Sequence, residues 1–127
     1  MKKKILIIDD ETDTVALMKM HLERGDAYEV RALTSAKDII AQVHEFAPDV
    51  ILLDLLMPGL GGIEACQMLD CDPIGMGVPI IVISGLIKDA DKLKAYKCGV
   101  VDYIVKPIDW DVLIKSIEKS IKAKSDN

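Results

Sequence analysis

The chain has 127 residues, of which 50% are hydrophobic and 29% are charged, and its formal net charge at pH 7 is −5. This length corresponds to one ordinary domain that can bury a core without disulfide bonds. The acidic excess argues against a nucleic-acid-binding surface and against an anionic membrane as partner. No apolar run approaches the ~20 residues that cross a bilayer. The three cysteines form no Cys-x-x-Cys motif, which favours reduced thiols in a cytoplasmic protein.

Hydrophobic periodicity predicts five strands that alternate with five helices. In chain order we expect a strand at 4–8, a helix at 12–24, a strand at 28–33, a helix after Ser35, a strand at 49–54, a helix at 63–69, a strand at 79–84, a helix at 88–97, a strand at 101–105 and a helix at 109–123. Ser35 is the expected N-cap of its helix, with Asp38 at position N3. The segment 71–78 contains Pro73, Gly75 and Gly77 and is expected to be a loop.

The first, third and fourth predicted strands contain continuous runs of β-branched and aliphatic residues, which is typical of parallel strands buried on both faces. Five βα units in so short a chain favour a single α/β domain with an open, doubly wound, five-stranded parallel sheet. We expect the flavodoxin-like strand order 2-1-3-4-5. That order brings together the carboxyl ends of the first, third, fourth and fifth strands, where such folds carry their functional groups.

Charged residues lie after or at the end of three of these strands: Asp9 and Asp10 after the first, Asp54 at the end of the third and Lys106 after the fifth. A single strand-end aspartate is often only a helix cap, but an adjacent pair together with a third aspartate is harder to explain in that way. Converging carboxylates repel one another, and a hard divalent cation such as Mg²⁺ relieves that repulsion. Pro107 holds Lys106 in extended backbone or in a cis bond, which favours an amine directed into the site.

The turn after the first strand argues against a nucleotide-binding site. It reads Asp9-Asp10-Glu11-Thr12-Asp13 and has none of the glycines that a phosphate-binding turn needs. A phosphate group would therefore bind at this edge only with a cation between it and the carboxylates.

Taken together, these residues resemble the receiver domain of two-component response regulators, including the single-domain chemotaxis regulators. The resemblance spans essentially the whole chain, so it implies one receiver domain over residues 1–127. The motifs that carry it are Asp9-Asp10-Glu11, the run 54–59 with Gly62 and Glu64 after it, Ser84, and Tyr103 ahead of Lys106-Pro107.

The resemblance implies a role for each matching residue. Asp54 would be the phosphoacceptor, and Mg²⁺ would be held by Asp9, Asp10, Asp54 and the backbone carbonyl of Leu56. The remaining assignments are Ser84 and Lys106 for binding the phosphoryl group, Ser84 and Tyr103 for switching, and Leu56 and Leu86 for tuning the phosphoryl lifetime.

The implied function is a phosphorylation-dependent signalling switch. A histidine kinase or a phosphotransfer protein would supply the phosphoryl group. The face formed by the fourth helix, fifth strand and fifth helix would then change, and it would control an output domain or effector protein and could also form a dimer. The resemblance implies no direct contact with nucleic acid or membrane, and no turnover of an external substrate.

Two other functions are weighed against this one. A phosphatase of the haloacid dehalogenase type also forms an aspartyl phosphate, but it needs a general acid two residues after the nucleophile, where this chain has Leu56. A receiver-like interaction module without phosphotransfer typically lacks the acceptor, the acidic pair or the lysine. This chain has all of them.

Overall fold

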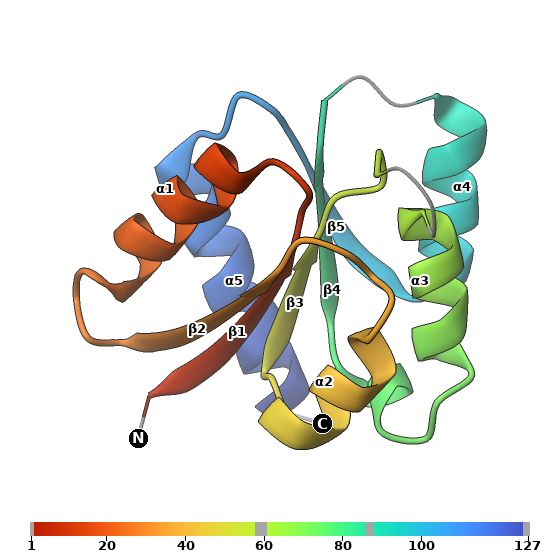
Figure 1. Ribbon diagram of the computed structural model, residues 1–127, viewed down its shortest axis with the longest axis horizontal. Coiled ribbons are helices and arrows are strands. Elements are labelled where there is room, and N and C mark those ends of the chain that lie inside the picture. Colours follow the sequence, from red (N-terminus) through yellow and green to blue (C-terminus); the bar gives the residue numbers. More distant parts are fainter. Residues whose placement is uncertain (1, 58–60, 86–87, 126–127) are drawn as a thin grey trace.

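The computed structural model describes residues 2–57, 61–85 and 88–125. Its elements, in chain order, are β1 (Lys3–Ile8), α1 (Thr12–Glu23), β2 (Tyr28–Leu33), α2 (Ile39–Phe46), β3 (Val50–Leu53), α3 (Gly62–Asp70), the 3₁₀ turn η1 (Gly75–Gly77), β4 (Ile80–Ser84), α4 (Asp89–Lys97), β5 (Val100–Val105) and α5 (Trp110–Ser125). The five strands form one parallel sheet in the order β2-β1-β3-β4-β5 (Figure 1). The predicted fold class and strand order are confirmed.

Helices cover both faces of the sheet, with α1 and α5 on one side and α2, α3 and α4 on the other (Figure 1). Because side chains alternate along a strand, neighbouring residues of β1 enter different cores. Ile5 and Ile7 pack with Met18 of α1 and Leu113 of α5, whereas Leu6 joins the core beneath α2, α3 and α4. Each fully buried aliphatic side chain of this kind stabilises the fold by about 1.5–3 kcal/mol.

The strand register aligns the carboxyl ends of the central strands. Ile8 pairs with Leu53, and Leu53 pairs with Val82. Between β4 and the outermost strand β5, Ser84 pairs with Val105. The residues that follow β1, β3 and β5, together with the last residue of β4, therefore lie along one edge of the sheet.

The start of α2 differs from the prediction. The Ser35 hydroxyl accepts a hydrogen bond from the backbone N–H of Lys37 at 3.1 Å, and the helix begins only at Ile39. Asp38 occupies the N-cap position without a side-chain capping bond. Serine forms such local turns as readily as it caps a helix, so the prediction placed the helix start too early. The predicted loop at 71–78 also contains the short turn η1.

Candidate functional site

Asp54, the residue directly after β3, lies at the centre of this edge and is almost completely buried, with 4% of its surface exposed. Its Oδ1 atom accepts two hydrogen bonds. The Ser84 hydroxyl at the end of β4 donates one at 3.0 Å, and the backbone N–H of Leu56 donates the other at 2.9 Å. These bonds fix the carboxylate in place, with its second oxygen facing Lys106.

Lys106 follows β5, and its ammonium group contacts three carboxylates. Its Nζ atom donates to Glu11 Oε1 at 2.6 Å, to Asp9 Oδ2 at 2.9 Å and to Asp54 Oδ2 at 3.4 Å. The Lys106–Pro107 peptide bond is cis, one of the two alternatives expected. Burial lowers the pKa of Lys106, but the hydrogen bonds to Glu11 and Asp9 and the charges of Asp54 and Asp9 outweigh burial and raise that pKa above its usual range. Lys106 is therefore a cation at neutral pH.

Asp9 is buried, and its Oδ2 atom contacts the ammonium group of Lys106. Burial raises the pKa of Asp9, and the hydrogen bonds from the Glu11 backbone N–H and from Lys106 offset only part of this rise. The charge of Asp54 adds to it. Burial, with a smaller contribution from the charge of Asp54, thus makes Asp9 easier to protonate than an exposed aspartate.

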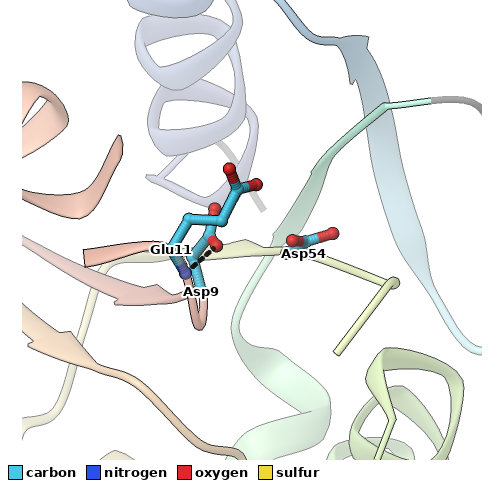
Figure 2. A group of neighbouring side chains, drawn as sticks. All are labelled: Asp9, Glu11 and Asp54. Carbon is cyan, nitrogen blue, oxygen red and sulfur yellow. Dashed lines mark hydrogen bonds between the residues drawn. The ribbon is translucent and has the colours of Figure 1, made fainter. Parts of the chain in front are cut away.

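Carboxylate oxygens of Asp9, Glu11 and Asp54 all lie within 4.8 Å of one another, and Figure 2 shows these side chains at the ends of β1 and β3. Three carboxylates face the single ammonium of Lys106, so negative charge is in excess. The donors are hard oxygens, which suit Mg²⁺. The chemistry of this donor set fits a magnesium ion.

Asp10 is half-buried and does not belong to the three-carboxylate group within the residues that the structure describes. Glu11, which the sequence prediction left out of the ligand set, belongs to this group. Glu11 is 59% exposed at its side chain and lies in an irregular turn, where hydrophobic periodicity gives no information about direction. The only available signal was its position beside the acidic pair.

Tyr103, the predicted switch residue on β5, is half-buried, and its hydroxyl donates to the backbone carbonyl of Gly85 at 3.2 Å. Burial raises the pKa of its phenol group, and the charge of Asp54 raises it further. Leu56 is exposed beside Asp54, with 54% of its surface accessible. Leu86, the second residue predicted to tune the phosphoryl lifetime, lies outside the described residues.

The three cysteines are free thiols, as predicted: Cys66 is buried, Cys98 is half-buried and Cys71 is exposed. Among the described residues, no helix combines the length and the apolar character needed to cross a membrane.

Known proteins are similar to this chain in sequence and in fold. Residues 5–118 match the family described as the response regulator receiver domain. The DNA-binding response regulator MtrA of Mycobacterium tuberculosis (strain ATCC 25618 / H37Rv) is 29% identical over 126 residues, which are 99% of this chain and 54% of MtrA. The response regulator PleD of Caulobacter vibrioides (strain NA1000 / CB15N) is 32% identical over 121 residues, which are 95% of this chain and 26% of PleD. The chain thus spans about half the length of the first relative and about a quarter of the second.

Solved structures show the same likeness. A putative response regulator from Chloroflexus aurantiacus J-10-fl superposes with a TM-score of 0.84 at 29% identity and covers 96% of this chain and 99% of that chain. A CheY-like receiver domain protein from Methanospirillum hungatei JF-1 has a TM-score of 0.89 at 22% identity, covers 99% of this chain and 98% of that chain, and shows the shared fold. The chain therefore belongs to the family of response regulator receiver domains, which are signalling domains of two-component systems.

Proposed function

We propose that the chain is a phosphorylation-dependent switch that accepts a phosphoryl group on Asp54. The observation that carries this proposal is the position of the Asp54 carboxylate, which is buried between the Ser84 hydroxyl and the Lys106 ammonium. A carboxylate oxygen of Asp54 attacks the phosphorus of the donor, and the new P–O bond replaces the bond to the leaving group. That leaving group is an imidazole nitrogen in a phosphohistidine donor.

The surrounding residues supply charge and position. Lys106 balances the charge of the equatorial phosphoryl oxygens, and Ser84 donates a hydrogen bond to one of them. Mg²⁺ would be held by Asp9, Asp10, Asp54 and the backbone carbonyl of Leu56, and Glu11 lies close enough to join this set. When bound, the ion neutralises negative charge on the carboxylates and on the transferred group.

Switching follows from the same contacts. Once the phosphoryl group is present, the Ser84 hydroxyl moves toward it and leaves space for Tyr103 to turn. The face formed by α4, β5 and α5 then changes shape and controls an output domain or effector protein, or a dimer contact. Leu56 and Leu86 restrict the approach of water and lengthen the life of the phosphorylated state.

The partners follow from the chemistry of the site. A histidine kinase or a phosphotransfer protein supplies the phosphoryl group, and residues 1–127 act as one receiver domain in the cytoplasm, where the free thiols stay reduced. The domain binds neither nucleic acid nor membrane directly. It hydrolyses its own aspartyl phosphate and turns over no external substrate, because Leu56 offers no general acid of the phosphatase type.

The test is phosphorylation by acetyl phosphate with Mg²⁺, followed by the intact mass of the protein. The wild type should gain one phosphoryl group that is stable in acid and lost in base. Asp54→Asn removes the nucleophile with almost no change of shape and should abolish labelling. Asp70→Asn, at an exposed position at the end of α3, is the matched control and should be labelled normally.

Stoichiometric labelling of Asp54→Asn would overturn the assignment of the acceptor. A wild type that stays unlabelled while keeping its fold would favour an interaction module without phosphotransfer. Steady hydrolysis of a phosphomonoester by the wild type would favour the phosphatase.

A further inference from the structure

A lysine of α4 contacts the face of the predicted switch tyrosine. The Lys92 Nζ atom lies 4.7 Å from the centroid of the Tyr103 ring. The hydroxyl at the far end of the same ring donates to the Gly85 carbonyl at 3.2 Å. The ring is therefore held at its face by α4 and at its tip by the residue that follows β4.

The position of Lys92 on its helix accounts for this contact. Lys92 is half-buried, and Ala95, three residues later on the same side of α4, is buried against the sheet. Lys94 lies on another side of the helix and is exposed. Lys92 forms no ion pair within 4.0 Å in the described part of the chain, whose ion pairs involve other residues. The aromatic ring is thus the partner that the structure gives this ammonium group.

We propose that Lys92 is a positioning residue for Tyr103, which it holds by a cation–π contact in the orientation that bonds Gly85. This inference rests on the proposed function, because it concerns the resting state of the tyrosine that turns when Asp54 is phosphorylated. The ring cannot leave its place without losing both contacts. The charge of Lys92 therefore biases the switch toward the unphosphorylated arrangement and links α4 directly to Tyr103.

The experiment observes the ring itself in the unphosphorylated chain. Fluorotyrosine incorporated at Tyr28, Tyr96 and Tyr103 gives separate ¹⁹F resonances, and Tyr103→Phe identifies the third. Lys92→Met keeps most of the side-chain length and removes the charge, so it should shift the Tyr103 population away from the wild-type orientation. Loss of a cation–π contact near the surface should change the ratio of the two Tyr103 orientations by about two- to fivefold.

Two further variants separate this role from a general effect of charge or packing. Lys92→Arg retains a cation that can lie over the ring and should restore the wild-type resonance. Lys94→Met removes the same charge from the same helix without touching the ring, and it should leave the resonance unchanged. A thermal melt of each variant confirms that the fold is kept, and Lys92→Gln replaces Lys92→Met if the latter does not fold.

A Tyr103 resonance that is unchanged in Lys92→Met, or in Lys92→Gln where that variant replaces it, would overturn the proposal, as would an equal shift in Lys94→Met. This readout needs no phosphorylation, so it stays informative if Asp54 is never labelled, and labelling by acetyl phosphate tests the proposed function separately. In labelled protein, the loss of the Lys92 contact should increase the reoriented fraction of Tyr103 by a similar two- to fivefold. A labelled Lys92→Met protein whose Tyr103 population equals that of the labelled wild type would also contradict the proposal.

Discussion

At the scale of single residues, Lys106 resolves an electrostatic conflict in the site. Asp9 and Asp54 are both buried, and Glu11 adds a third carboxylate near them. In the described part of the chain, Lys106 is the one cation that forms ion pairs with Asp9 and Asp54. Its side chain is only 17% exposed, so solvent screens these pairs weakly. The same lysine that would bind a phosphoryl group therefore also stabilises the resting fold.

Replacing this lysine should cost stability. Lys106→Met leaves Asp9 and Asp54 buried without a cation, and we expect the free energy of unfolding to fall by about 1–3 kcal/mol near pH 7. This is less than the full cost of breaking a buried pair, because water reaches part of the site. Urea unfolding measures the change. Lys119→Met, an exposed substitution on α5, is the control and should have almost no effect.

The pH dependence of this loss has a definite sign. The pKa of Asp9 is raised, so lowering the pH through that raised value protonates Asp9 and removes one of the unpaired charges of the variant. The difference between wild type and Lys106→Met should therefore narrow from about pH 7 to about pH 4. The pKa of Lys106 is also raised, so its own contribution is complete at neutral pH and is lost only as the pH rises through its folded-state pKa. A difference that stays constant over the acid range would contradict this account.

At the scale of elements, the start of α3 packs directly on the segment that carries the phosphoacceptor. A Cβ atom at Gly62 would lie 2.4 Å from the Cα of Leu55 and 2.6 Å from the carbonyl oxygen of Asp54. Gly62→Ala would gain up to about 1 kcal/mol of helix propensity in open space. The clash should reverse this gain, so we expect a net loss of about 1–3 kcal/mol in the free energy of unfolding.

The matched control is Gly25→Ala, after the end of α1, where nothing lies within 4 Å of the added Cβ. This substitution should leave the free energy of unfolding almost unchanged. Gly62→Ala should also slow labelling by acetyl phosphate. The added methyl group fits only if the backbone of Asp54 shifts, and this shift displaces the phosphoacceptor. If the two substitutions change the free energy of unfolding equally, the start of α3 can move away from Leu55 and Asp54 without loss of stability, and the prediction is wrong.

The elements also show what the sequence could predict and why the rest was missed. The apolar runs of β1, β3 and β4 are buried on both faces, so their apolar sequence predicted parallel strands, and the alternation of five strands with five helices predicted their order. Asp54 comes directly after such a run, and Lys106 comes directly after the apolar end of β5, which predicted their place at the edge of the sheet. Residues outside regular elements gave weaker signals: Ser35 forms a local turn where a cap was expected, and Glu11 reaches Lys106 from a turn. The Lys92–Tyr103 contact joins α4 and β5, and the sequence gives no information on how α4 is placed relative to β5.

At the scale of the whole molecule, the apolar cores and the charged groups of the site occupy different parts of the fold. Two apolar cores on opposite faces of the sheet stabilise the chain, while the charged groups collect at one edge of it. The apolar cores offer no charge that could neutralise these groups. A cation that binds at this edge should therefore stabilise the entire domain, because the unfolded chain holds no such arrangement of carboxylates.

Millimolar Mg²⁺ should accordingly raise the thermal midpoint of the wild type. Binding to the native state alone stabilises by about 2.7 kcal/mol at a concentration of 100 times Kd. Protons compete with the metal for Asp9, whose pKa is raised, so the effect should weaken as the pH falls through that value, earlier than for an ordinary aspartate. Differential scanning calorimetry with and without Mg²⁺ at about pH 7 and about pH 5 measures both effects.

Controls for this experiment separate a specific site from general screening. NaCl at matched ionic strength should raise the midpoint little, since exposed charges contribute weakly to stability. Asp54→Asn removes one of the carboxylates within 4.8 Å of the others and should reduce the response to Mg²⁺, whereas Asp70→Asn should keep it. If NaCl and Mg²⁺ raise the midpoint equally, the carboxylates at this edge bind no magnesium ion, and if Asp54→Asn responds to Mg²⁺ like the wild type, Asp54 is not a ligand of the ion.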